Sequence, residues 1–114
     1  MLKIWHNPRC RKSRETLAIL QESKKAVTIR LYLEDAPSEL EIREILGQLG
    51  FDVPRNLMRR GEAIYKEQGL KNETDSAILV KSMAENPILI ERPVVTNGTK
   101  AVIGRPPEAV KALF

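Results

Sequence analysis

The sequence contains one cysteine, few aromatic residues and no long hydrophobic run. A single cysteine excludes an internal disulfide, which fits a reducing compartment. Aromatic residues make up only 4% of the chain, so the interleaved aromatic surfaces typical of nucleic-acid-binding proteins are scarce. Apolar runs of a few residues fall far short of the ~20 needed to cross a bilayer, and the N-terminus lacks the apolar stretch of a signal peptide. We therefore expect a cytoplasmic protein that binds neither nucleic acid nor a membrane; we also expect a monomer.

The overall composition is that of an ordinary globular protein. Hydrophobic residues make up 42% and charged residues 30% of a 114-residue chain with a net charge of +4. This length can bury a core without disulfides or metals, and it corresponds to about one domain. The modest positive charge suits a small anionic substrate, which needs only a few converging cations. We expect a single domain over residues 1–114.

The N-terminal third predicts a strand, a helix and a second strand. Residues 2–5 alternate apolar and polar side chains, and the pattern becomes helical from Cys10 or Arg11 to about Lys24. Residues 27–33 alternate again, which predicts a second strand with one buried face. A right-handed crossover would make the two strands parallel. The expected inward side chains are Thr16, Leu17 and Leu20 on the helix and Val27, Ile29, Leu31 and Leu33 on the second strand.

The middle of the chain predicts helices for about fifty residues after Pro37. Ser38 and Glu41 form a capping box, and Gly50 ends the helix that follows. A short helix is expected over residues 54–60, and another starts at Thr74. The expected buried stripes are Ile42, Ile45, Leu46 and Leu49 on the first helix and Ile78, Leu79 and Met83 on the last.

The C-terminal part predicts a hairpin and a final helix. Residues 94–95 and 101–103 read as strands around Asn97-Gly98, the strongest short hairpin signal. Pro106-Pro107 opens a helix that turns Val110 and Leu113 inward. A parallel pair plus an antiparallel hairpin makes a mixed four-stranded sheet with helices on its faces. The order predicts a thioredoxin-like α/β fold, with a helical insertion between its βαβ and ββα halves.

Cys10 lies where the first strand leads into the first helix, a usual ligand site in such folds. Unpaired N–H groups and the dipole of a helix N-terminus favour negative charge there. Arg9, Arg11, Lys12 and Arg14 add positive charge along the sequence. These effects favour the thiolate and predict a reactive cysteine, the alternative being a buried, inert thiol.

Three further residues fit the same loop. Asn7 and the following proline shape the chain before the thiol. Ser13 stands three residues after Cys10, where a Cys-x-x-Cys protein holds its second thiol, and it would cap the helix or hydrogen-bond the thiolate. His6 is either a nearby donor or a structural histidine at a strand end.

Several segments together resemble the glutaredoxin-linked arsenate reductase (ArsC) family. They are H-N-P-R-C-R-K-S-R-E-T-L, L-Y-L-E-D-A-P-S, N-P-I-L-I-E-R-P-V-V and I-G-R-P-P-E. The resemblance runs from about residue 2 to the C-terminus in the same order. The chain looks most like the short, ArsC-like members, which lack the C-terminal extension of the longer enzymes.

The resemblance implies a set of site residues. Cys10 matches the family's nucleophilic cysteine. Arg59, or alternatively Arg60, matches an anion-binding arginine of the helical insertion. Arg92 and Arg105 match two more, each next to a proline at a strand boundary, and Pro93 is expected to be cis. Guanidinium groups suit oxyanions because they form paired hydrogen bonds, although most arginines in proteins simply lie on a solvated surface.

The same resemblance implies a function. Arsenate would be reduced to arsenite through a covalent bond between Cys10 and arsenic. Since the chain has no second thiol, the electrons must come from outside, with glutathione as donor and glutaredoxin completing the cycle. No bound cofactor and no metal are expected.

Two other functions stay open. One is a glutathione-dependent thiol oxidoreductase with a different substrate, in which the arginines bind glutathione carboxylates. The other is a regulator of the Spx type, which shares the fold and binds RNA polymerase. Spx-type proteins commonly sense oxidation through Cys-x-x-Cys, and Ser13 interrupts that motif here.

Overall fold

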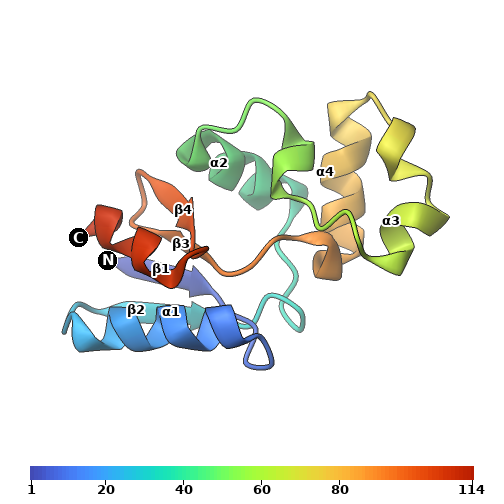
Figure 1. The fold of residues 1–114 in the computed structure, drawn as a ribbon. Helices are drawn as coiled ribbons and strands as arrows, with labels where there is room; N and C mark the ends of the chain where they lie inside the picture. The colour runs from blue at the N-terminus through green and yellow to red at the C-terminus, as the bar shows by residue number, and fades with distance from the viewer. The chain divides into compact units, whose positions relative to one another are not determined.

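The sheet has four strands in the order β2-β1-β3-β4 (Figure 1). β1 runs parallel to β2, while β3 is antiparallel to both β1 and β4. This computed structural model describes all residues 1–114, and it confirms the predicted mixed α/β sheet. The strands are β1 Leu2–Trp5, β2 Val27–Arg30, β3 Val94–Thr96 and β4 Ala101–Ile103.

The chain forms two compact units. The first comprises Met1–Asp35 and Arg92–Phe114, and the second comprises Ala36–Glu91. The first unit holds the whole sheet, and the second is the predicted helical insertion between the βαβ and ββα halves. Each unit is described by itself, and the single domain over residues 1–114 stays a prediction.

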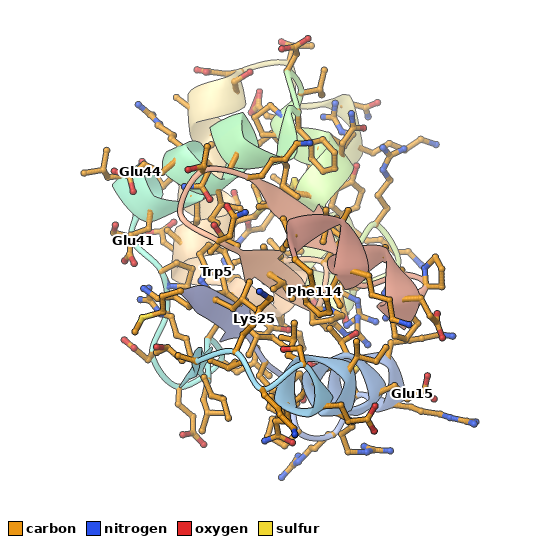
Figure 2. The ribbon with its side chains drawn as sticks, turned by 90° about the vertical axis from the view of Figure 1, so that its left-hand side faces the viewer. Trp5, Glu15, Lys25, Glu41, Glu44 and Phe114 are labelled. Carbon is orange, nitrogen blue, oxygen red and sulfur yellow. The ribbon has the colours of Figure 1, made fainter.

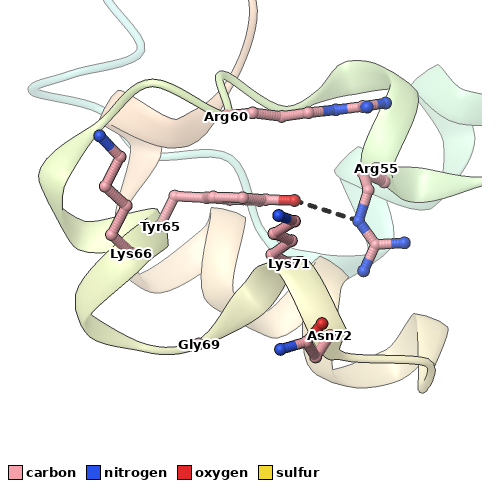
Figure 3. Close-up of a pocket in the computed structure, with 7 residues that line it drawn as sticks. All are labelled: Arg55, Arg60, Tyr65, Lys66, Gly69, Lys71 and Asn72. Atoms are coloured by element: carbon pink, nitrogen blue, oxygen red, sulfur yellow. Dashed lines mark hydrogen bonds between the residues drawn. The ribbon is translucent and has the colours of Figure 1, made fainter.

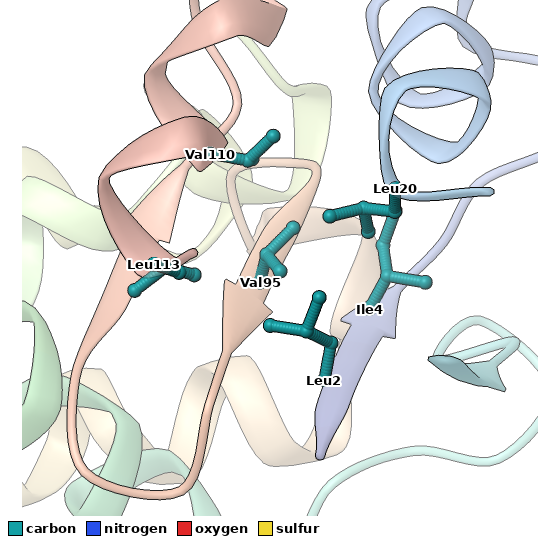
Figure 4. Close-up of a cluster of buried hydrophobic side chains, with 6 residues drawn as sticks. All are labelled: Leu2, Ile4, Leu20, Val95, Val110 and Leu113. Carbon is teal, nitrogen blue, oxygen red and sulfur yellow. The ribbon is translucent and has the colours of Figure 1, made fainter. Parts of the chain in front are cut away.

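Helix α1 (Arg11–Glu22) and the 3₁₀ helix η4 (Pro107–Leu113) supply side chains to the core of the first unit (Figure 4). Ile4 pairs with Val95 across β1 and β3, so both point to the same face of the sheet. Removing such side chains from water contributes about 1.5–3 kcal/mol each to folding. The core residues are Leu2, Ile4, Leu20, Val95, Val110 and Leu113.

The predicted second strand is right in position but wrong in its extent, and of its four expected inward residues only Val27 packs against the core. β2 ends at Arg30, and the amides of Glu34 and Asp35 donate to the carbonyl of Leu31 at 3.0 and 2.8 Å. These bonds close a turn where the strand was expected to continue. β2 is also an edge strand, so it has a neighbour on one side only. Consequently Ile29, Leu31 and Leu33 are 46%, 37% and 42% exposed.

The hairpin signal at Asn97-Gly98 is confirmed. Asn97 N donates to Lys100 O at 3.0 Å, and Gly98 has a φ of 94°, which suits glycine. The inward positions of Val110 and Leu113 are also confirmed. Lys25 Nζ lies 5.9 Å from the centre of the Phe114 ring (Figure 2), a cation–π contact within the first unit.

The second unit begins with α2 (Glu39–Leu49), whose ends follow the prediction. Ser38 N donates to Glu41 Oε1 at 3.0 Å, and Glu41 N donates to Ser38 Oγ at 3.1 Å. Gly50 ends the helix with a φ of 73°, a left-handed conformation that glycine adopts without a steric penalty. Local sequence signals therefore set both ends of α2.

The remaining helices differ in detail from the prediction. The short helix η1 ends at Leu57 rather than residue 60, and α4 follows an N-cap at Asp75 rather than Thr74. Ile78 is 42% exposed instead of buried. None of the helices is long and apolar enough to cross a membrane. Their bounds are η1 Pro54–Leu57, α3 Ala63–Glu67, η2 Leu70–Asn72, α4 Ser76–Glu85 and η3 Pro87–Leu89.

Candidate functional site

Cys10 is the N-cap residue of α1, with extended backbone angles and no side-chain cap. Its N–H donates to Asn7 O at 3.0 Å, and its carbonyl accepts from Arg14 N at 3.0 Å. The residue is 8% exposed. The structure therefore places the thiol at the start of the helix, as the sequence predicted, where the helix N-terminus favours negative charge.

Arg105 provides the charged contact to the thiol. Its Nη2 lies 3.8 Å from Cys10 Sγ and donates to it. Its Nε donates to Arg92 O at 2.9 Å, so the main chain at the start of β3 holds the guanidinium. Two predicted site residues, Cys10 and Arg105, thus meet although they are 95 positions apart in the sequence.

The cations nearest to Cys10 in the sequence have other contacts. Arg11 forms an ion pair with Glu15 at 2.8 Å, with 84% of its own side chain exposed. Arg14 Nη1 donates to Pro8 O at 3.0 Å. The guanidinium bonded to the thiol is instead that of Arg105. Neither Arg11 nor Arg14 is the residue that bonds to the thiol, and the effect of their nearby charge on the thiol stays a prediction.

Pro93 lies buried at the start of β3, and the Arg92–Pro93 bond is cis as expected. Pro93 O accepts from Gly104 N at 2.9 Å. The Arg105–Pro106 bond is also cis, which was not predicted. Arg92 is half-buried, and its carbonyl is the group that holds Arg105.

Gly104 lies in a space too small for a side chain. A Cβ at this position would lie 2.5 Å from Thr16 Oγ1 and 2.8 Å from Pro93 Cγ. Thr16 is itself fixed because its hydroxyl donates to Lys12 O at 2.7 Å. Neither Gly104 nor Thr16 was predicted as part of the site, although a glycine directly before Arg105 indicates a close approach of the backbone.

Ser13 has a different role from the two predicted ones. It is completely buried, and its Oγ accepts from Asn7 N at 3.0 Å and lies 2.7 Å from His6 Nδ1. It neither caps α1 nor bonds to the thiol. His6 is 6% exposed, and Asn7 Oδ1 accepts from Arg9 N at 3.0 Å. These bonds fix the shape of the loop that carries Cys10.

Arg59 and Arg60 belong to the second unit. Arg59 N donates to Leu89 O at 2.7 Å, and its guanidinium forms an ion pair with Glu62. Arg60 is exposed, and its Nη2 lies 3.5 Å from Asn56 Oδ1. Since Cys10 lies in the first unit, a shared site that includes Arg59 or Arg60 stays a prediction.

The pKa of His6 is lowered from its usual 6.5, first by burial and second by the positive charge of Arg14. Neutral His6 can accept a hydrogen bond at Nδ1 from the Ser13 hydroxyl, while the Ser13 oxygen accepts from Asn7 N. Protonation would occupy that acceptor and add a buried charge. The loop before Cys10 is therefore built around a neutral histidine.

This lowered pKa predicts a pH dependence of stability. As the pH falls below about 6.5, His6 takes up a proton in the unfolded chain before it does so in the folded one. The free energy of unfolding should then fall, with a slope of at most about 1.4 kcal/mol per pH unit for one group. The contribution of neutral His6 to the free energy of unfolding is complete at pH values above the pKa of His6 in the unfolded chain, and it is lost as the pH falls towards the lower pKa of the folded state. Urea titrations between about pH 7.5 and 5.5, above most carboxyl groups, measure the slope.

The matched variant for this test is His6→Asn, whose amide oxygen can take the place of Nδ1 as acceptor but does not titrate. We expect the variant to lose the part of the slope that His6 contributes. An unchanged slope would assign the pH dependence to other groups.

A mixed sheet built from a βαβ half and a ββα half, with a cysteine at the N-cap of the first helix, defines the thioredoxin-like class of α/β folds. The chain belongs to the ArsC family, whose model matches residues 5–113. This confirms the resemblance found in the sequence.

Two curated relatives and one solved structure are similar to the chain over almost their whole lengths. An arsenate reductase of Haemophilus influenzae is 47% identical over 108 residues, which cover 94% of this chain and 93% of that protein. An uncharacterised protein of Escherichia coli is 46% identical, with 96% and 92% covered. The solved structure of an arsenate reductase from Vibrio cholerae is 44% identical with a TM-score of 0.94, covering 99% of this chain and 97% of that one.

Proposed function

We propose that this protein reduces arsenate to arsenite, with Cys10 as the nucleophile and an external thiol as the electron donor. The observation that carries the proposal is the contact of 3.8 Å between Arg105 Nη2 and Cys10 Sγ at the N-terminus of α1. This arrangement offers a guanidinium next to sulfur to an incoming oxyanion. Relatives named arsenate reductase support the choice of substrate.

The first step forms a bond between sulfur and arsenic. The thiolate of Cys10 attacks arsenate, and one arsenate oxygen leaves as water after taking up protons. We propose that the guanidinium groups of Arg105, Arg92 and Arg59 hold the remaining oxygens and balance the negative charge of the crowded intermediate. Phosphate has a similar shape and charge, so the reactivity of arsenic towards sulfur would provide the selectivity.

The second step transfers the electrons. A glutathione thiolate attacks Cys10 sulfur, and the electron pair of the sulfur–arsenic bond leaves with arsenic as arsenite. Glutaredoxin and a second glutathione then reduce the mixed disulfide and restore the thiol. Over the cycle, one arsenate and two thiols give one arsenite, one disulfide and one water. The external donor is required because Cys10 is the only cysteine of the chain.

A coupled assay tests this proposal. The protein is mixed with arsenate, glutathione, glutaredoxin, glutathione reductase and NADPH, and the consumption of NADPH is followed. We expect consumption that stops when arsenate, glutathione or glutaredoxin is left out. The thioredoxin system should not replace glutathione and glutaredoxin.

Other results would favour the other two functions. If arsenate causes no NADPH consumption but the protein exchanges rapidly with oxidised glutathione, a thiol oxidoreductase with another substrate is the better assignment. Stable binding to RNA polymerase without thiol turnover would favour a regulator.

A further inference from the structure

The second unit contains a cavity of about 530 Å³ whose lining is strongly basic (Figure 3). We refer to it as the basic pocket. It lies where η1, α3 and η2 come together, and no acidic side chain lines it. The residues of the basic pocket are Arg55, Arg60, Tyr65, Lys66, Gly69, Lys71 and Asn72.

Arg55 is the fixed cation of the basic pocket. Its Nε donates to the Tyr65 hydroxyl at 3.2 Å, and its Nη2 donates to the carbonyls of Leu70, at 2.8 Å, and Glu73. These partners orient the half-buried guanidinium without neutralising it, because carbonyl and hydroxyl groups carry no net charge. Nη1 makes no hydrogen bond within the protein, so a donor stays available on a guanidinium that is already ordered.

Three flexible cations complete the lining. Arg60, Lys66 and Lys71 are exposed, and none of them, nor Arg55, forms an ion pair within the chain. Four positive charges around one cavity repel one another unless an anion lies between them. Tyr65, which is 3% exposed, and the hydrocarbon stems of the long side chains add apolar wall to the cavity.

We propose that the basic pocket binds a small polyanion that carries at least two carboxylate or phosphate groups. One anionic group would bond to Arg55 at Nη1, and the others would meet the mobile charges of Lys66 and Lys71. The volume suits a molecule of metabolite size, since small-molecule sites commonly span ~300–1,000 Å³. The pocket lies wholly in the second unit and involves neither Cys10 nor Arg59, Arg92 or Arg105, the arginines of the proposed arsenate site, so the proposal is independent of the proposed function.

Citrate and inorganic pyrophosphate are suitable probes, because both carry several negative charges and one presents carboxylates while the other presents phosphates. Calorimetric titration of the full chain at low salt should give a dissociation constant below about 1 mM for at least one of them. The amide NMR signals of residues 65–72 should shift on binding. Tighter binding of citrate would indicate a carboxylate ligand, and tighter binding of pyrophosphate a phosphorylated one.

Lys66→Gln and Lys71→Gln should each weaken the binding of the probe by about three- to tenfold, as expected for losing one partly exposed charge contact. Lys81→Gln is the matched control. It removes one exposed charge from α4 in the same unit, outside the pocket, and should leave binding unchanged. Both lysines are exposed, and circular dichroism with urea unfolding verifies that each variant is folded.

Any one of four results would overturn the proposal, the first three from the probes and variants described above. The first is that neither probe binds at a concentration of roughly 10 mM, the weakest binding that these contacts could explain. The second is an equal loss of affinity in Lys71→Gln and Lys81→Gln. The third is that only NMR signals outside residues 65–72 shift. Binding of poly-glutamate without binding of either small probe would also overturn it, because the partner would then be an acidic protein segment. These readouts need no turnover and stay valid whether or not arsenate is reduced.

Discussion

Replacing Cys10 by serine should lower the rate of arsenate reduction by at least about 10³-fold, to the background without protein. A serine hydroxyl stays protonated near neutral pH and cannot form the sulfur–arsenic bond or the mixed disulfide. The coupled NADPH assay measures the loss. A Cys10→Ser protein that keeps a tenth or more of the activity would disprove the role of this residue.

The stability of the Cys10→Ser variant serves as the control for folding. Cys10 is the N-cap of α1 and its side chain makes no cap, whereas serine is among the best N-cap residues. We therefore expect Cys10→Ser to be as stable as the unmodified protein or more stable, by up to about 1 kcal/mol. Urea unfolding measures this, and a loss of activity at full stability can be assigned to the missing thiol.

Replacing Arg105 by alanine should lower kcat/KM for arsenate by about 10²-fold, similar to the removal of one donor from a site that stabilises a developing charge. The variant loses the contact to Cys10 Sγ and one of the proposed arsenate ligands. Alkylation of Cys10 by iodoacetamide should also slow down, because the sulfur loses its contact with a guanidinium. Arg105→Lys should recover only part of the activity, since lysine cannot form a paired contact.

Arg11→Ala is the matched control for Arg105→Ala. It removes the same charge from the residue next to Cys10 in the sequence, but that guanidinium is exposed and bonded to Glu15. We expect a change in kcat/KM of less than about threefold, because this charge is exposed to water and already paired with Glu15. Equal losses in both variants would mean that net charge, rather than the contact to sulfur, controls the reaction.

The parts of the fold that depend on local chemistry could be predicted from the sequence. Ser38 and Glu41 satisfy each other's backbone donors, and Gly50 adopts a left-handed conformation, so both ends of α2 follow from neighbouring residues. Asn97-Gly98 likewise sets the hairpin between β3 and β4. In these segments, every partner is within a few positions along the chain.

Segments whose environment is set by distant residues were predicted less well. The alternation that continues to Leu31 and Leu33 is indistinguishable in sequence from that of a longer strand. Only the structure shows that the strand lies at the edge of the sheet and that the chain turns after Arg30. Tyr32, which is in the opposite phase of the alternation, is the residue that is buried.

In the candidate site, too, local features could be predicted from the sequence and contacts between distant residues could not. The position of Cys10 at a helix start follows from local pattern, but charge near it in the sequence pointed to Arg11 and Arg14, whose guanidinium groups bond elsewhere. The contact with Arg105 arises because the end of β4 returns towards the start of α1. Nothing in the sequence around Cys10 encodes that approach. The family resemblance selected Arg105, and its place next to a proline at a strand boundary supported the choice.

The confined position of Gly104 has a consequence for how the site tolerates change. Its backbone is held between Thr16 and Pro93, and Arg105 is the next residue. The packing at Gly104 fixes the backbone from which the Arg105 side chain starts, and the bonds to Arg92 O and Cys10 Sγ orient its guanidinium before substrate arrives. A single added methyl group at position 104 would force Thr16, Pro93 or the main chain next to Arg105 to shift. A residue without a side chain thus helps to set the position of the charge at sulfur.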